Sequence, residues 1–237
     1  MRHIYAVQRK ALEQAVALKL IPANPLNGIS LPKCKSRRWE FYTEDELKEL
    51  LAFAGEDKKT ELFVSLFVLT GMRRGEITAL RFADIDFDNE KINVKRNMVR
   101  GENGEVVEKD PKSVNGFRSI PIPHRLTELL QAELQRRQAE GLPDEFVLDN
   151  GRGEPMKPDS VTRFWTRFLG KNPQIRPLRL HDLRHSHVTM LVNNAVPPAV
   201  TAARIGDTVA TAMAVYSHSD ARQEKKAGEL VAKLLCN

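Results

Sequence analysis

The 237-residue sequence predicts an α+β fold that is mostly α-helical and contains a small three-stranded antiparallel sheet. Apolar residues recur three and four positions apart over most of the chain, which is typical of helices packed on a core. One region, residues 91–122, instead contains short β-branched segments and a Gly-Glu-Asn-Gly turn, which indicates strands. Hydrophobic residues make up 41% of the chain and charged residues 29%, a composition typical of globular proteins.

The charge and cysteine content narrow the class of protein. Lysine and arginine number 37 against 31 aspartate and glutamate residues, so the formal net charge is +6. This excess favours an anionic partner, with nucleic acid first. The two cysteines, Cys34 and Cys236, lack metal-type spacing and favour a reducing compartment. Since no apolar stretch is long enough to span a membrane and no signal peptide begins the chain, we expect a cytoplasmic protein.

The N-terminal segment is expected to be a helix followed by a linker. Residues 2–20 place apolar side chains on one helical face, and residues 22–32 contain Pro22, Pro25 and Gly28. The helix begins without a capping residue before it, so we expect that an N-terminal portion of the protein is missing from this sequence.

Three helices are expected between the linker and the strands. Thr43 and Glu46 form a capping-box pattern that begins a helix over 43–54. Residues 59–70 are apolar nearly all round, which predicts a buried helix, and Gly71 ends it. A short helix is then expected from 74 to 81.

The predicted sheet has three strands. Residues 91–99 and 105–109 flank the turn at 101–104, and residues 117–122 form the third strand, which Pro121 places at an edge. Further helices are expected at 124–139, 158–170, 179–193, 197–205, 208–216 and 220–235.

Two arginines are candidates for binding phosphate. Arg73 follows the buried helix and Gly71, and Arg184 lies one turn after His181 on the same helical face. A guanidinium is always charged and its planar fork matches two phosphate oxygens. The alternative is that each arginine forms an ordinary surface salt bridge. His181 can act as an acid or base near neutral pH, or be a hydrogen-bonded core histidine.

A metal site is a weaker alternative for the same segment. His181, His185 and His187 are close in sequence, but no glutamate completes a His-Glu-x-x-His motif and no cysteine is near. We therefore expect no metal.

Lys112 and Tyr216 complete the candidate residues. Lys112 lies on the link between the second and third strands, where it could protonate a leaving alkoxide or be a solvated lysine. Tyr216 has an ordinary pKa of ~10 and needs nearby cations to act as a nucleophile. The alternative is a tyrosine that packs near a helix end.

Together these segments resemble the tyrosine recombinase family, of the phage-integrase type, over residues 40–220. The resemblance is carried by Thr-Gly-Met-Arg-Arg-Gly-Glu at 70–76, Pro-Lys-Ser at 111–113, Arg-Ser-Ile-Pro at 118–121, Leu-His-Asp-Leu-Arg-His-Ser-His at 180–187 and Tyr-Ser-His at 216–218. It implies the DNA breaking-rejoining catalytic fold of that family. It also implies site roles, with Glu76 in support of the catalytic residues Arg73, Lys112, His181, Arg184 and the nucleophile Tyr216. No cofactor is implied.

The resemblance also implies how the chain is organised. Residues 1–32 are similar to the last helix of a core-binding domain and its linker, and residues 33–237 to a catalytic domain. The expected partners are double-stranded DNA attachment sites and a homotetramer on DNA, with accessory DNA-bending proteins. Helix 220–235 either docks on a neighbouring protomer or packs on its own domain. The expected setting is bacterial or phage-encoded, at the nucleoid.

The implied activity is site-specific recombination for integration or excision of a mobile element. Tyr216 would attack a DNA phosphodiester and form a 3′-phosphotyrosyl bond, which a 5′-hydroxyl later reverses without ATP. Two alternatives stay open: an impaired integrase that acts as a DNA-binding module, and a nicking-closing enzyme like type IB topoisomerases.

One position departs from the family pattern. Leu-Gly-His usually precedes the tyrosine by nine residues, but here Asp207 takes the place of the histidine. An ionised carboxylate cannot donate a hydrogen bond and repels phosphate. We expect Asp207 to cap the helix that leads to Tyr216. Because the hydrogen-bond donor is lost, we expect the reaction to be slower by ~10²–10³. His187 or His218 could replace the lost donor.

Overall fold

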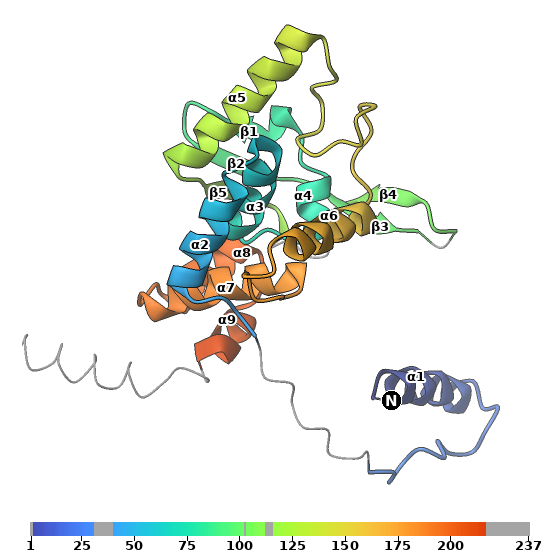
Figure 1. Ribbon diagram of the computed structural model, residues 1–237. Coiled ribbons are helices and arrows are strands. Elements are labelled where there is room, and N and C mark those ends of the chain that lie inside the picture. The colour runs from blue at the N-terminus through green and yellow to red at the C-terminus, as the bar shows by residue number, and fades with distance from the viewer. Residues whose placement is uncertain (1, 31–39, 102, 112–115, 217–237) are drawn as a thin grey trace, which may run out of the picture. The chain divides into compact units, whose positions relative to one another are not determined.

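A computed structural model describes residues 2–30, 40–101, 103–111 and 116–216 (Figure 1). The chain divides into two compact units, residues 1–38 and 39–237. In the part described, no helix is long and apolar enough to cross a membrane. The expected helix 220–235 and the segments 31–39 and 112–115 lie outside the described residues.

The first unit is a helix with a turn folded back on it. Helix α1 spans Arg2–Ala17, shorter than the expected 2–20 because Lys19 takes a left-handed φ of 57°. The Tyr5 hydroxyl donates to the Leu26 carbonyl at 3.3 Å, and the Asn24 side chain donates to the Arg9 carbonyl at 3.1 Å. The assignment of this unit to the last helix of a core-binding domain and its linker stays a prediction.

The second unit begins with two of the predicted helices. Helix α2 spans Glu44–Ala54, and the capping box of Thr43 and Glu46 is present. Helix α3 spans Lys58–Thr70 and is buried on nearly all sides, as its sequence predicts. It ends at Gly71, whose φ of 64° is left-handed and whose Cα faces the His187 ring so closely that a Cβ would lie 2.6 Å from it.

Helix α4 spans Arg74–Thr78 and ends earlier than the expected 74–81. The chain turns away because the Leu80 carbonyl accepts from the Val147 amide at 3.0 Å and Phe82 donates to the Glu145 carbonyl at 3.0 Å. These bonds tie the chain to residues 145–147, and the chain continues through a 3-10 turn, Phe82–Asp84, into the first strand.

The strands form two small sheets. Strands β1 (Ile85–Asp86), β2 (Lys91–Val94) and β5 (Arg118–Pro121) form a three-stranded antiparallel sheet in the order β1-β2-β5. Strands β3 (Asn97–Arg100) and β4 (Val106–Lys109) form a separate hairpin. The edge position of β5 and the hairpin are confirmed.

The single strand expected over 91–99 is wrong, because the chain breaks between β2 and β3. Lys95 and Arg96 lie at the break, and both bind the buried carboxylate of Asp84, at 3.1 and 2.6 Å. The two ion pairs bend the chain out of the first sheet, so β3 and β4 extend away from it (Figure 1).

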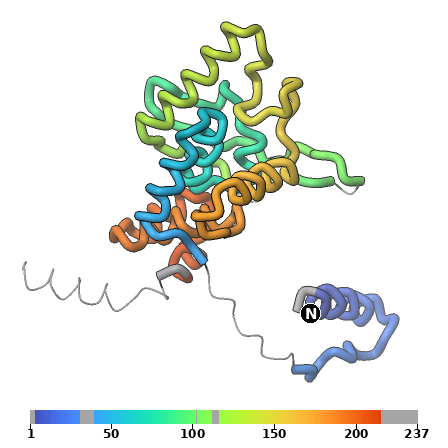
Figure 2. Tube along the Cα trace, in the orientation of Figure 1, coloured from blue at the N-terminus to red at the C-terminus, as the bar shows by residue number. Residues whose placement is uncertain are grey.

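The remaining helices agree with the sequence to within one or two residues. They are α5 (His124–Glu140), α6 (Pro158–Lys171), α7 (Leu180–Asn193), α8 (Pro198–Ile205) and α9 (Val209–Tyr216). Helix α7 packs against α3, far away in sequence (Figure 2). This packing brings the end of α3 and the start of α7 together, where the candidate site lies.

Candidate active site

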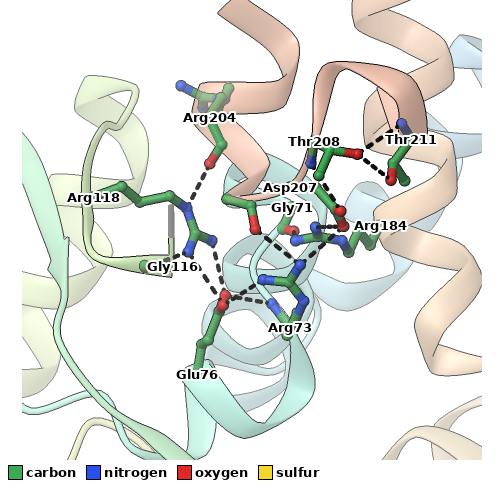
Figure 3. Close-up of polar contacts among 11 residues, drawn as sticks. Gly71, Arg73, Glu76, Gly116, Arg118, Arg184, Arg204, Asp207, Thr208 and Thr211 are labelled. Atoms are coloured by element: carbon green, nitrogen blue, oxygen red, sulfur yellow. Dashed lines mark hydrogen bonds and ion pairs between the residues drawn. The ribbon is translucent and has the colours of Figure 1, made fainter. Parts of the chain in front are cut away.

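Arg73 and Arg184 are brought together by the packing of α3 on α7. Arg73 precedes α4 directly, and Arg184 lies in the second turn of α7. The Arg184 Nη1 donates to the Gly71 carbonyl at 2.7 Å, so α7 holds the turn that positions Arg73 (Figure 3). Burial, together with the charge of Arg73, lowers the pKa of Arg184 to about 10, which leaves it a cation at neutral pH.

Glu76 orients Arg73. Its buried carboxylate accepts from the Arg73 backbone amide at 2.8 Å and from the Arg73 Nη1 at 3.0 Å. Burial alone would raise the pKa of Glu76, but hydrogen bonds and charges of Arg118 and Arg73 outweigh it and lower the pKa. Glu76 is therefore an ionised acceptor that holds Arg73 in place, and its part in catalysis stays a prediction.

Arg118 is a site residue that the sequence reasoning did not single out. Its side chain is 6% exposed and forms two hydrogen bonds with the Glu76 carboxylate, at 2.8 and 3.2 Å. Its Nε donates to the Arg204 carbonyl at 2.8 Å (Figure 3). The strand pattern could have indicated that Arg118 points inward, since Arg118 shares a strand face with Ile120, which is fully buried.

Asp207 lies against the two arginines and does not cap α9. Its Oδ2 accepts from the Nη2 of Arg73 at 2.9 Å and from the Nη2 of Arg184 at 3.2 Å. The cap is supplied by Thr208, whose Oγ1 accepts from the Thr211 amide at 3.2 Å. The expected capping role of Asp207 is therefore wrong, because the adjacent threonine meets that need.

The pKa of Asp207 is lowered. Burial works against this shift, but the Thr208 amide, the Thr211 hydroxyl and the charges of Arg73 and Arg184 outweigh it. Asp207 is thus an ionised acceptor and cannot donate to a phosphate at neutral pH.

His181 lies with the arginines, whereas His187 does not. His181 is exposed at the start of α7, but desolvation of its ring by neighbouring atoms, followed by the charge of Arg184, lowers its pKa. His187 is buried, with Nδ1 bound to the Val68 carbonyl at 2.8 Å and Nε2 accepting from the Arg204 Nε at 3.1 Å. Both nitrogens of His187 are occupied, so it does not replace the missing donor at Asp207.

The three histidines of α7, His181, His185 and His187, do not form a metal site in the described part of the chain. His181 and His185 meet edge to face with ring centroids 4.7 Å apart. Across the described ranges, no three His, Cys, Asp or Glu side chains are placed to hold a metal ion.

Arg73, His181 and Arg184 line a cationic groove of about 920 Å³. It runs between the β3–β4 hairpin, α6 and the start of α7, and Asp159 supplies a carboxylate to its wall. Its cationic lining residues are Arg73, Arg74, Arg100, Lys157, Arg163, Arg179 and Arg184. A groove of this charge suits a polyanion.

Two predicted residues cannot be placed fully. Tyr216 is the last residue of α9, and its side chain is outside the described part, as are Lys112 and His218. The hydroxyls of the other two tyrosines have hydrogen-bond partners. Tyr5, in the first unit, donates to the Leu26 carbonyl, and the buried Tyr42 donates to the Arg176 carbonyl. Burial raises the pKa of Tyr42 to about 12, which makes it a poor nucleophile.

The chain is similar to known integrases. A model of the phage integrase family matches residues 40–223. The ICEBs1 integrase of Bacillus subtilis (strain 168) is 26% identical over 236 residues, which cover 95% of this chain and 63% of that protein. An integrase of Mycobacterium phage FRAT1 is 26% identical over 238 residues, covering 98% and 69%. The chain thus spans less than two thirds of the Bacillus relative.

Solved structures show the same fold. The Tn1549 transposon integrase in complex with circular intermediate DNA has a TM-score of 0.81 at 20% identity, covering 98% of this chain and 80% of that one. XerA recombinase has a TM-score of 0.64 at 21% identity, covering 98% and 75%. The predicted α+β fold of tyrosine recombinases is confirmed.

Proposed function

Because this chain belongs to the phage integrase family, we propose that it cleaves and rejoins DNA strands at specific sites through a 3′-phosphotyrosyl intermediate. The observation that carries the proposal is the convergence of Arg73 and Arg184 at one point of a cationic groove. A phosphoryl transition state carries more charge on its oxygens than the ground state, so paired guanidiniums stabilise it preferentially.

The chemical steps are divided among the residues. Tyr216 attacks the phosphorus and displaces the 5′-oxygen of the DNA, and Lys112 protonates that leaving oxygen. His181 assists proton transfer, because its lowered pKa keeps it a neutral acceptor at pH 7. The 5′-hydroxyl of a partner strand then attacks the phosphotyrosine and restores the tyrosine, so no external energy source is required.

The proposed partners follow from the same activity. The substrate is double-stranded DNA that carries attachment sites. A homotetramer joins two duplexes, and residues 220–235 of each protomer contact a neighbouring protomer. Accessory DNA-bending proteins assist the assembly. The proposed location is the cytoplasm of a bacterium, at the nucleoid.

Two other activities remain as outcomes of the test. A DNA-binding module without chemistry would bind duplexes and form no covalent adduct. A nicking-closing enzyme would relax supercoiled DNA of any sequence.

The test uses nicked duplexes made from a direct repeat that flanks the coding sequence. Cleavage beside the nick releases a short 5′-hydroxyl strand and traps the protein on the 3′ end. The proposal expects a denaturation-resistant adduct that forms on the repeat, fails on a scrambled duplex and is lost in Arg73→Ala and Arg184→Ala. Adducts on both duplexes with relaxation of any plasmid would indicate the nicking-closing enzyme. Binding without any adduct would indicate the binding module.

A further inference from the structure

Asp207 occupies the point at which the two arginines converge. The same oxygen, Oδ2, accepts from the Nη2 of Arg73 at 2.9 Å and from the Nη2 of Arg184 at 3.2 Å (Figure 3). A phosphate oxygen held by both guanidiniums would use these donors. The other bonds of the arginines hold them in place: Arg73 donates to Glu76 and, through the same Nη2, to the Gly206 carbonyl at 2.9 Å, and Arg184 donates to the Gly71 carbonyl.

The charge of the carboxylate matches that of the ligand. Asp207 carries one negative charge when ionised, and a DNA phosphodiester also carries one. Replacement of the carboxylate by the phosphodiester therefore leaves the charge around Arg73 and Arg184 unchanged. If both anions stayed, they would repel each other at close range. The two are thus alternatives for the same position.

The local backbone allows Asp207 to leave. It lies in the turn between α8 and α9, after Gly206, whose φ of 64° is left-handed. Its side chain is 28% exposed. The cap of α9 depends on Thr208 and Thr211, so rotation of the Asp207 side chain breaks its own bond to the Thr208 amide but keeps the cap.

We propose that Asp207 is an internal competitor for the scissile phosphate, which holds the Arg73–Arg184 pair in the free protein and must be displaced when DNA binds. This inference rests on the proposed phosphate-binding role of the two arginines. If Asp207 holds the pair in about nine of ten free molecules, the apparent affinity for phosphate is reduced about tenfold.

The test measures binding of inorganic phosphate to the full chain by calorimetry at neutral pH. Asp207→Asn and Asp207→Ser both remove the competing charge, and thermal unfolding confirms that each variant folds. Asp159→Asn is the charge-matched comparison, because Asp159 lines the groove but pairs with Arg100 at 3.4 Å. No DNA cleavage is needed, so the result is independent of whether Tyr216 is the nucleophile.

The proposal expects both Asp207 variants to bind phosphate about tenfold more tightly than the parent protein. The Asp159 variant should gain less than about twofold, since an exposed charge is screened by salt. Equal or weaker binding by both Asp207 variants would overturn the proposal and make Asp207 a residue that positions the arginines. An equal gain in the Asp159 variant would overturn it too, because it would show a general effect of charge.

Discussion

The guanidinium of Arg118 and the carboxylate of Glu76 form a buried pair joined by two hydrogen bonds, at 2.8 and 3.2 Å. Glu76 in turn holds both the backbone and the side chain of Arg73. Arg118 also binds the Arg204 carbonyl at the end of α8. One cation from β5 therefore connects the support of Arg73 with the turn that carries Asp207.

This connection predicts that Arg118 positions Arg73 without contacting DNA. Arg118→Lys keeps the charge but loses the planar fork, so Glu76 is held less firmly. We expect the rate of adduct formation at saturating DNA to fall by roughly 10- to 100-fold, a loss typical of supporting residues. Affinity for DNA should stay within about twofold, since Arg118 does not line the groove.

The control for Arg118 is Arg137→Lys. Arg137 is also a buried arginine, and its Nε binds Glu133 at 2.7 Å, away from the groove. Arg137→Lys should lower the stability of the protein without lowering the rate of adduct formation at saturating DNA.

Glu76→Gln combined with Arg118→Lys should be no slower than the slower single variant, because both substitutions act on one contact. Additive losses would show that Arg118 acts separately from Glu76.

Gly71 is predicted to be a glycine whose replacement disturbs the site. Gly71→Ala places a Cβ 2.6 Å from the His187 ring in addition to a left-handed backbone. Gly141 ends α5 with a similar φ of 63°, but an added Cβ there meets nothing within 4 Å. Gly141→Ala should cost about 1–2 kcal/mol of unfolding free energy for the backbone alone. Gly71→Ala should cost more, roughly 2–4 kcal/mol with overpacking.

Urea unfolding of both glycine variants provides the measurement. Since the backbone term is shared, the difference between them isolates the contact with His187. Equal midpoints for the two variants would show that the ring moves aside without cost.

We expect the low pKa of the buried His187 to make the protein less stable in mild acid. Burial, followed by the charge of Arg204, lowers its pKa to about 4, whereas an unfolded histidine has a pKa of about 6.5. Between these values the unfolded chain binds more protons, so the unfolding free energy falls as the pH falls from 6.5 to 4. Once the pH has fallen below 4, protonation of His187 has lowered the unfolding free energy by about 3 kcal/mol in total. Above pH 6.5 none of this stability is lost.

The measurement compares the pH dependence of unfolding in the parent protein and in His187→Gln. The pKa of His185 is also lowered to about 4, but that residue is present in both proteins. The variant should be less stable at pH 7 and lose less stability on acidification. Parallel curves would contradict the assigned role of His187.

The groove predicts a salt-dependent contribution from Arg163. Arg163→Gln in the Tyr216→Phe background should weaken binding of a fixed duplex and reduce the slope of log affinity against log salt by about 1. Arg136→Gln is the control, because Arg136 pairs with Glu133 and Glu140 outside the groove. If both variants changed the slope equally, the groove would not be the DNA-binding surface.

Residue type and spacing, taken together with the family resemblance, predicted which side chains to look for, and the catalytic roles stay predictions. Arg73, His181 and Arg184 could be found because each follows a recognisable helix signal, and the packing of α3 on α7 brings Arg73 and Arg184 together. The partners of Asp207 could not be predicted, since the pattern suggested a cap and did not show that Thr208 supplies it.

The path of the strands was harder to predict than the helices. Residues 91–99 read as one strand, because alternation does not reveal that Lys95 and Arg96 both bind Asp84 from another part of the chain. Arg118 was missed for a related reason. A charged residue in a strand normally faces solvent, and only the distant partner Glu76 allows its burial.

Covalent trapping on the nicked repeat shows directly whether Tyr216 attacks DNA. The parent protein, Tyr216→Phe and Tyr5→Phe are incubated with the same duplex, and the adduct is digested and sequenced by mass spectrometry. We expect a nucleotide linked to the peptide that contains Tyr216, an undiminished adduct in Tyr5→Phe and none in Tyr216→Phe. A covalent adduct that persists in Tyr216→Phe would rule out Tyr216 as the nucleophile.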